Sequence, residues 1–292
     1  NYLMRKFFIN FFCIFFCTIV NADADGIKKT LEKTSEKISE YSVGLIPGDG
    51  HTEVSIDLRE NSKPDYSILA VRELLELESG NIFTQFSLFN TEHSNKEKII
   101  GNLGLGSRKL FNDNTMLAGF NAFVDNDFNN ENRRVSIGFE LRNSVLDFNS
   151  NIYKGLEDTQ DEKVLDGWDY KLASQIPYLH WSKIFINHYE WDGVLRNDIK
   201  GVKIGSEMNL TNSLDFELAY DDKDKKGLDD DWYAKIRFVH PPRNNGPTAM
   251  DGISQTAWKE NKDMSSELLS KVERNNKIMI EFKGSSTISR TD

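Results

Sequence analysis

The chain has 292 residues, 38% of them hydrophobic and 28% charged, with a formal net charge of −10 and a mean hydropathy of −0.53. Beyond the N-terminus no apolar run approaches the roughly 20 residues that a helical membrane span needs, which excludes helical spans but not a β-barrel, whose strands are apolar only at alternate positions. The acidic balance disfavours a nucleic-acid partner, which needs a basic surface.

Residues 1–26 are predicted to be a secretory signal peptide. The positive pair Arg5-Lys6 precedes the apolar stretch Phe7–Val20, which is too short to span a membrane, and Ala22-Asp23-Ala24 offers a cleavage site. Both cysteines lie in this segment, so we expect the mature chain to have no disulfide, thiolate nucleophile or cysteine metal site. Residues 27–50 are expected to be a periplasmic N-terminal segment, either a short helix or a linker.

Extended segments then follow one another through residues 51–240. In Asn132–Asp147 apolar side chains alternate with polar ones, which is typical of a strand with one apolar and one polar face. Such segments have about the ten residues that a tilted strand needs to cross a bilayer. The twelve predicted strands are Thr52–Arg59, Tyr66–Leu77, Asn81–Thr91, Lys98–Leu110, Thr115–Asp125, Arg133–Arg142, Val145–Gly155, Gly167–Ile176, Lys183–Trp191, Lys200–Leu210, Ser213–Tyr220 and Asp231–Val239. Tyr66–Leu77 fits a helix equally well.

Little helical sequence is available to cover the apolar faces of these strands. A closed ring with its apolar faces towards lipid and its polar faces inside is therefore expected. The connections support this fold class, because long polar links are predicted to alternate with short ones, as in barrels with short periplasmic turns and longer external loops. The long links are Asn61–Asp65, Glu92–Glu97, Asn126–Asn132, Leu156–Asp166, Asp192–Ile199 and Asp221–Asp230.

The pattern changes after Val239. Prolines and glycines interrupt residues 240–252, Ile253–Val272 is predicted to be a helix, and Lys277–Lys283 is extended. Residues 241–283 are therefore expected to be a helical linker in the barrel lumen, followed in 284–292 by a tail or the start of another domain.

Candidate functional residues fall into two sets. Polar side chains expected to face the lumen are Arg134, Glu140, Arg142, Lys203 and Glu207, and aromatic side chains expected at the lipid interface are Trp168, Trp181, Trp191 and Trp232. The five histidines have no metal-binding spacing, and no arrangement of nucleophile, base and acid is visible. We therefore expect no catalytic residue, metal or cofactor.

Several motifs resemble, in order, the β-domain of inverse autotransporters, the intimin/invasin family. They are Asn102–Phe111 (NLGLGSRKLF), Met116–Asp127 (MLAGFNAFVDND), Arg133–Glu140 (RRVSIGFE), Gly167–Tyr170 (GWDY), Ile176–Tyr178 (IPY) and Val272–Phe282 (VERNNKIMIEF). The similarity covers about Thr52–Lys283. It implies an all-β, twelve-stranded antiparallel transmembrane barrel in the outer membrane of a Gram-negative bacterium, with a linker that leads a C-terminal passenger through the pore.

The resemblance also implies function and partners. The barrel would export and display an adhesin or invasin passenger, with outer-membrane lipid, the barrel assembly machinery and periplasmic chaperones as partners and a host-cell receptor reached through the passenger. The sequence departs from the family in that only Gly284–Asp292 follow the predicted linker, so we expect either a truncated reading frame or a barrel that acts alone. Two alternatives remain open, a porin or channel and a barrel enzyme with its active site at the rim.

Overall fold

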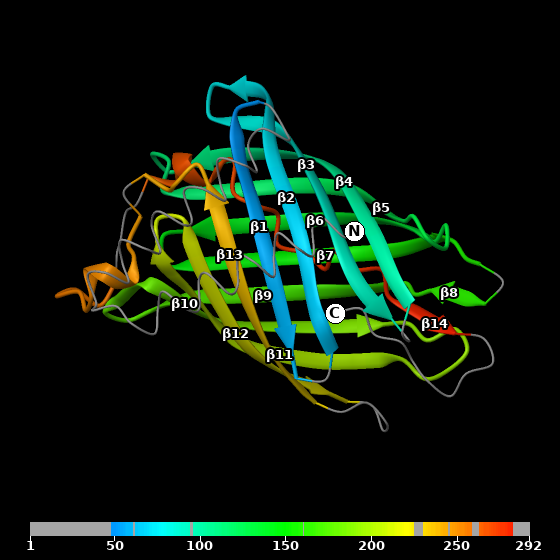
Figure 1. Cartoon of the computed structure of the whole chain (residues 1–292). Coiled ribbons are helices and arrows are strands. Elements are labelled where there is room, and N and C mark those ends of the chain that lie inside the picture. Colours follow the sequence, from blue (N-terminus) through cyan, green and yellow to red (C-terminus); the bar gives the residue numbers. More distant parts are fainter. Residues whose placement is uncertain are drawn as a thin grey trace.

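The strands of the chain close into an antiparallel barrel. The computed structural model describes residues 48–60, 62–93, 96–159, 161–224, 230–244, 246–258 and 263–282. Its barrel strands are β1 (Gly50–Arg59), β2 (Ser62–Leu77), β3 (Gly80–His93), β4 (Lys96–Phe111), β5 (Met116–Asp127), β6 (Arg133–Asn143), β7 (Leu146–Glu157), β9 (Gly167–Ile176), β10 (Leu179–Trp191), β11 (Ile199–Thr211), β12 (Leu214–Lys223) and β13 (Asp231–His240). Each pairs with its neighbours in chain order, and β1 closes the ring against β13 (Figure 1).

Every predicted strand is therefore a barrel strand, and the predicted fold class is confirmed. The ambiguous segment at residues 66–77 lies in β2, where it pairs with β1 and β3. A short additional strand, β8 (Glu162–Val164), lies in the connection between β7 and β9, and it pairs with β14 (Ile280–Phe282) near the C-terminus. The predicted signal peptide and the N-terminal segment up to residue 47 lie outside the described residues, as do residues 283–292.

The barrel is apolar outside and polar inside. Along β5 and β6 buried and exposed side chains alternate strictly, as expected from the two-residue period of a strand. Phe120 and Ile137 on the outer face are 68% and 62% exposed, whereas Asp125 and Arg134 on the inner face are fully buried. The exposed apolar belt needs lipid around it, and the buried polar groups need partners inside.

The two ends of the barrel differ in their connections. At one end, which we call the inner end, the short turns β6–β7, β9–β10 and β11–β12 each span two residues between strands. At the opposite end, which we call the outer end, β7–β9, β10–β11 and β12–β13 are joined by long loops. The predicted alternation of long and short links is wrong for the first two links at the outer end, which are short. β1 ends at Arg59 and β2 begins at Ser62, and β3 ends at His93 and β4 begins at Lys96. Polar residues that were predicted to lie in loops there extend the hydrogen-bonded strands instead.

The predicted helix at Ile253–Val272 is also wrong within the described ranges. Residues 246–258 and 263–282 contain only two short 3-10 turns, η1 (Ala249–Asp251) and η2 (Met264–Glu267). Outside these two turns, several backbone groups bond to the barrel. Ser254 N–H donates to the Tyr178 carbonyl and Tyr178 N–H to the Ala257 carbonyl. A wall that satisfies backbone groups removes the need for helical hydrogen bonds. None of the helical turns in these ranges is long and apolar enough to cross a membrane.

Candidate functional site in the barrel lumen

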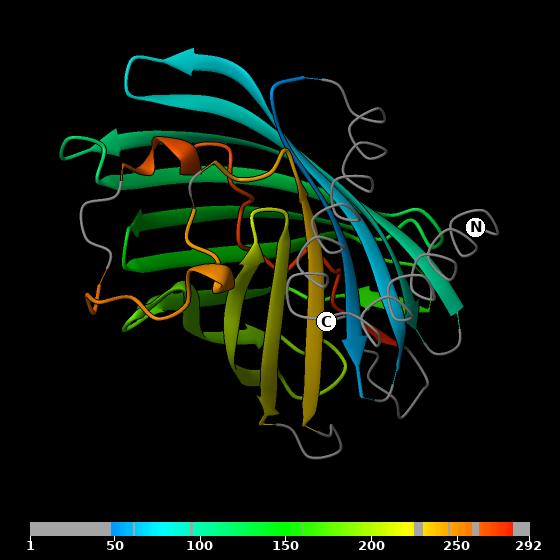
Figure 2. The same cartoon turned by 60° about the vertical axis from the view of Figure 1, so that its left-hand side comes forward.

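A single extended segment, residues 263–282, runs through the barrel and is called the lumen segment here. At the inner end Met264 N–H donates to the carbonyl of Asn114 in the β4–β5 turn, at 2.8 Å. At the outer end Leu165 N–H donates to the Met279 carbonyl at 2.9 Å, next to the β8–β14 pair. Figure 2 shows the segment in red, inside the ring of strands. It therefore connects the two ends of the barrel through the interior.

Apolar contacts hold the first part of the lumen segment. Met264 is buried against Leu110 and Leu117, and Leu268 packs on the same cluster. Asp263 caps η2 by accepting from Ser265 N–H at 2.8 Å, and hydrogen bonds from the Ser265 side chain and backbone lower the pKa of this carboxyl group below its usual value. The first part of the lumen segment is thus held mainly by packing.

Arginines of the barrel wall then bind the backbone of the lumen segment. Arg108 on β4 donates to the carbonyls of Leu268 and Ser270, at 2.8 and 2.6 Å. The same guanidinium is held by Glu140 on β6, with Nε 2.5 Å from Oε1. Arg142, also bound to Glu140, donates to the Ser270 hydroxyl at 2.8 Å. A non-helical backbone is therefore satisfied in a site without bulk water.

The midpoint of the lumen segment carries a buried ion network. Arg274 contacts Asp125 of β5 through both nitrogens, with Nη1 3.0 Å from Oδ1 and Nη2 2.7 Å from Oδ2. Asp125 also accepts from Arg134 Nε at 2.8 Å, while Arg134 Nη2 donates to the Asn275 carbonyl at 2.8 Å. Bidentate pairs of this kind fix both partners in orientation as well as distance.

Two of these arginines stack on aromatic rings that lie over glycines. The Arg274 guanidinium is 4.3 Å from the Phe123 ring, and Arg108 is equally far from Phe83. A side chain at Gly104 would lie 2.3 Å from the Phe123 ring, and one at Gly106 would lie 2.3 Å from the Phe83 ring. The glycines at alternate inward positions of β4 therefore make room for the platforms on which the arginines rest.

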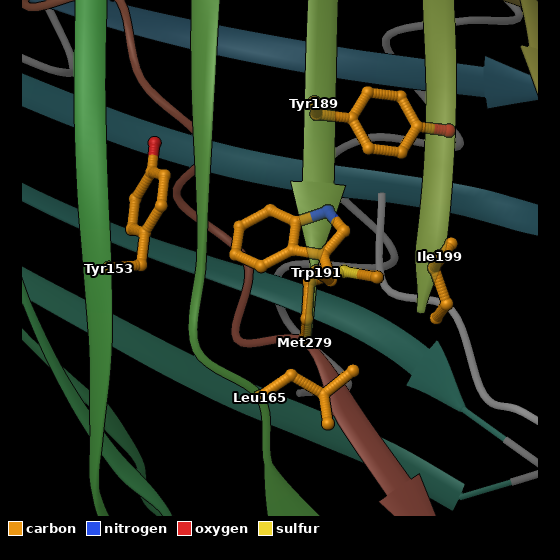
Figure 3. Close-up of a cluster of buried hydrophobic side chains, with 6 residues drawn as sticks. All are labelled: Tyr153, Leu165, Tyr189, Trp191, Ile199 and Met279. Atoms are coloured by element: carbon orange, nitrogen blue, oxygen red, sulfur yellow. The ribbon is translucent and has the colours of Figure 1, made fainter. Parts of the chain in front are cut away.

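The outer part of the lumen segment presents apolar side chains in two directions. Ile278 and Ile280 pack with Phe89, Ile100 and Val164. Met279 points the other way, into a cluster with Tyr153, Leu165, Tyr189, Trp191 and Ile199 (Figure 3). Apolar contacts therefore hold this part of the segment from both sides.

A carboxylate on each strand of the β8–β14 pair fixes that pair to the rim. Glu281 on β14 is fully buried, and its Oε2 accepts from the backbone N–H groups of Val194 and Leu195, at 3.0 and 2.7 Å. Glu162 on β8 accepts from Lys98 Nζ at 2.8 Å and from Asn130 at 2.8 Å. The loops β7–β9 and β10–β11 therefore both grip the end of the lumen segment, and we call this arrangement the outer clamp.

The five polar side chains predicted for the lumen divide into two groups. Arg134, Glu140 and Arg142 belong to the networks that bind the lumen segment. Lys203 and Glu207 form the second group, because they contact other side chains of the wall. Lys203 lies over the Tyr189 ring at 5.2 Å, and Glu207 pairs with Lys171. Lys171 also reaches the lumen segment through Glu273, at 2.9 Å.

One interface tryptophan was predicted wrongly. Trp191 is 1% exposed and lies inside the barrel, because it shares the inward parity of Tyr189 on β10. Trp168 stacks on Tyr170, with centroids 5.9 Å apart.

The two remaining predicted tryptophans have different surroundings. Trp232 is 52% exposed and packs against Tyr220. The Trp181 indole donates to the Gly252 carbonyl at 2.9 Å, and so contacts the chain that follows β13.

Several functional residues were missed from the sequence, among them Arg108, Asp125 and Arg274. Gly104 and Gly106 of β4 could have indicated such a site. Inward-facing glycines next to the inward-facing Arg108 leave space in the lumen for aromatic rings on which arginines can stack. Within the described residues, no group of three or more His, Asp or Glu side chains could hold a metal ion. The chemistry that the lumen offers is the non-covalent binding of an extended polypeptide.

Comparisons with known proteins agree with this geometry. The family model described as "Inverse autotransporter, beta-domain" matches residues 20–276. An attaching and effacing protein homolog of Escherichia coli strain K12 is 25% identical over 138 residues, which span 44% of this chain and 45% of that protein. The chain thus matches less than half the length of this relative.

One solved structure shows the same kind of fold, and a second is more distantly similar. A structure from work on the in-meso crystallization of membrane proteins has a TM-score of 0.62 at 16% identity, covering 80% of this chain and all of the other. The outer membrane phospholipase A from Escherichia coli has a TM-score of 0.42 at 6% identity, covering 66% and 96%. The protein is an outer-membrane β-barrel, and it belongs to the inverse autotransporter β-domain family.

Proposed function

We propose that this barrel anchors a C-terminal adhesin or invasin passenger in the outer membrane and exports it, with the lumen segment as the linker between anchor and passenger. The observation that carries the proposal is the buried two-point pair between Arg274 of the lumen segment and Asp125 of the wall. A segment held at its middle and gripped by the outer clamp delivers whatever follows Phe282 to the outer side. The action is steric and electrostatic, without a covalent step.

The orientation and partners follow from the same proposal. The inner end with its short turns would face the periplasm, as in other outer-membrane barrels. Residues 1–26 would direct export from the cytoplasm, and the chain would pass to periplasmic chaperones and the barrel assembly machinery before insertion. A host-cell receptor would be reached only through the passenger, and lipid would surround the apolar belt.

Removal of the lumen segment tests whether it fills the pore. Refolded full-length protein and a variant that lacks residues 263–282 are compared in planar lipid bilayers. We expect the deletion to raise the single-channel conductance, because polar wall groups such as Arg108 and Glu140 would face water. Equal conductance would contradict a filled pore, and high conductance of the full-length protein would favour a porin.

Display of a fused reporter tests the anchor itself. An epitope-tagged immunoglobulin-type domain fused after Asp292 should become accessible to antibody on intact cells. The matched control carries the same fusion without residues 1–26 and should show no surface signal. A tagged barrel that is inserted in the outer membrane while its reporter stays in the periplasm would count against export.

A further inference from the structure

A buried lysine near the outer end of β4 lies between two carboxylates that come from different elements. Lys98 Nζ is 3.0 Å from Oδ2 of Asp127, the last residue of β5, and 2.8 Å from Oε2 of Glu162 on β8. All three residues are buried, at 2%, 1% and 3% exposure. The outer clamp accounts for the contact with Glu162. It does not account for a second carboxylate at the same amine.

The Asp127 carboxylate is held in one orientation by the turn that follows it. Its Oδ1 accepts from the backbone N–H groups of Asn129 and Asn130, at 2.9 and 3.3 Å, which leaves Oδ2 towards Lys98. Two N–H donors on one oxygen stabilise the negative charge that develops there when the carboxyl carbon is attacked. The Lys98 amine is one bond away from that carbon, Cγ. A nucleophile and a polarised acyl carbon are therefore already in place.

Glu162 is positioned to move protons between these two groups. Its Oε1 and Oε2 lie 3.0 and 2.8 Å from Lys98 Nζ, within the range for general base catalysis. The side-chain amides of Asn130 and Asn132 both donate to the Glu162 carboxylate and fix its position.

Apolar side chains surround this polar group. Ile100 lies two positions after Lys98 on β4, and Val164 lies two positions after Glu162 on β8, so each shares the face of its polar neighbour. Both belong to the buried cluster around Phe89 and Ile280. The cluster keeps bulk water away, which protects an amide formed here from hydrolysis.

We propose that Lys98 and Asp127 form an intramolecular isopeptide bond, with Glu162 as general base and then general acid. Glu162 takes a proton from Nζ, the amine attacks Cγ, and a bond between Nζ and Cγ forms. The bond between Cγ and Oδ2 breaks, and Oδ2 leaves as water with the two protons that Nζ gives up. One ammonium and one carboxylate thus become one amide and one water. Glu162 is regenerated, and no other reactant is needed.

The bond would tie β4 to β5 just beyond their last paired residues, Ile100 and Asp127. The N–H that remains on Nζ still donates to Glu162, so the outer clamp is kept. The inference does not depend on the proposed export function.

Mass spectrometry of the full-length protein, purified folded from outer membranes, tests the bond. We expect the mature chain to be lighter than its sequence by one water molecule, and a protease digest to contain a branched peptide that joins Lys98 to Asp127. Lys154 and Asp166 pair at the same rim, but Lys154 is 69% exposed, and this pair should stay unlinked in the same digest. An unmodified mass of the folded wild type would overturn the proposal, without any variant having to fold.

Two variants separate the isopeptide bond from other losses of water. Lys98→Arg keeps the positive charge but removes the amine, and Glu162→Gln keeps an oxygen for the asparagine amides but removes the base. We expect both variants to keep the full mass of their sequences. The same loss of water in Lys98→Arg would place it elsewhere in the chain and overturn the bond. Complete crosslinking in Glu162→Gln would overturn the role of Glu162.

Discussion

The Arg274 guanidinium and the Asp125 carboxylate meet in the middle of the barrel, and both side chains are completely shielded from solvent. One belongs to the lumen segment and the other to β5. A buried charge without its partner is strongly unfavourable, so this pair is satisfied in only one alignment of the segment against the wall. A slip by one residue would also exchange the faces of Ile278 and Met279, which pack in opposite directions. The interior therefore fixes both the position and the register of the lumen segment.

Replacement of Arg274 should loosen the segment without opening the barrel. In Arg274→Met the Asp125 carboxylate keeps Arg134 and Asn102 as partners, so we expect a loss of up to about 3–5 kcal/mol, the range for one partner of a buried pair. Hydrogen exchange of residues 263–282 measures it, and the barrel strands should keep their protection. A second variant, Arg274→Met with Asp125→Asn, should lose more than the single variant, because it also leaves the buried Arg134 without its carboxylate partner.

The control for this prediction is Lys154→Met. Lys154 also pairs with an aspartate, Asp166, but its side chain is 69% exposed at the outer rim. Solvent screens such a pair, so exchange of the lumen segment should stay as in the wild type. If both single variants exchange alike, the central pair does not hold the segment.

The fold could be predicted from the sequence because its main signal is local. Alternation within β6 depends only on which faces meet lipid and water, and the inward parity of Arg134, Glu140 and Arg142 follows from it. The partners of these residues could not be predicted, since Arg108 and Arg274 are brought to them by strand pairing and by the path of the lumen segment. The predicted helix failed for the same reason, because its amphipathic pattern does not reveal that wall side chains would take its backbone acceptors.

Trp191 shows where a general rule overrode a local signal. Tryptophans are common at lipid interfaces, and the end of β10 is such a position. Parity nevertheless places Trp191 on the same face as Tyr189, inside the barrel. Alternation along the strand was the better guide, as it is a steric property of the backbone and interface enrichment is only an average preference.

Replacement of Glu281 should weaken the outer clamp. In Glu281→Ala the N–H groups of Val194 and Leu195 lose their acceptor, and an unpaired buried donor costs about 1–3 kcal/mol. Hydrogen exchange should therefore increase at residues 194 and 195. Glu281→Gln keeps one carbonyl oxygen that can accept both bonds, and should behave more like the wild type. Equal exchange in all three proteins would show that the loop is held by other contacts.

A charge among the apolar groups of the outer mouth should let water and ions pass. Ile280 is 2% exposed, and Ile280→Asp would bury a carboxylate among Phe89, Ile100 and Ile278. We expect the β8–β14 pair to open and the single-channel conductance in planar bilayers to rise. The matched control is Ile253→Asp, because Ile253 is 78% exposed beyond the inner end. Conductance that rises equally in both variants would assign the effect to added charge and not to the apolar seal.

The lipid-facing belt should tolerate charge at its edge and not at its middle. Ile152 and Leu156 share the outward face of β7 and are 58% and 57% exposed, but Ile152 lies near the middle of the strand and Leu156 near its outer end. Arginine on the lipid face of a barrel costs about 2–4 kcal/mol at the bilayer midplane and about 0–1 kcal/mol near the interface. Ile152→Arg should therefore unfold in phospholipid vesicles at a clearly lower denaturant concentration than the wild type, whereas Leu156→Arg should unfold close to it. In detergent micelles, which adapt to a charge more easily than a bilayer, the difference between the two variants should shrink. Equal stability of both variants in vesicles would mean that this face of β7 does not lie against hydrocarbon.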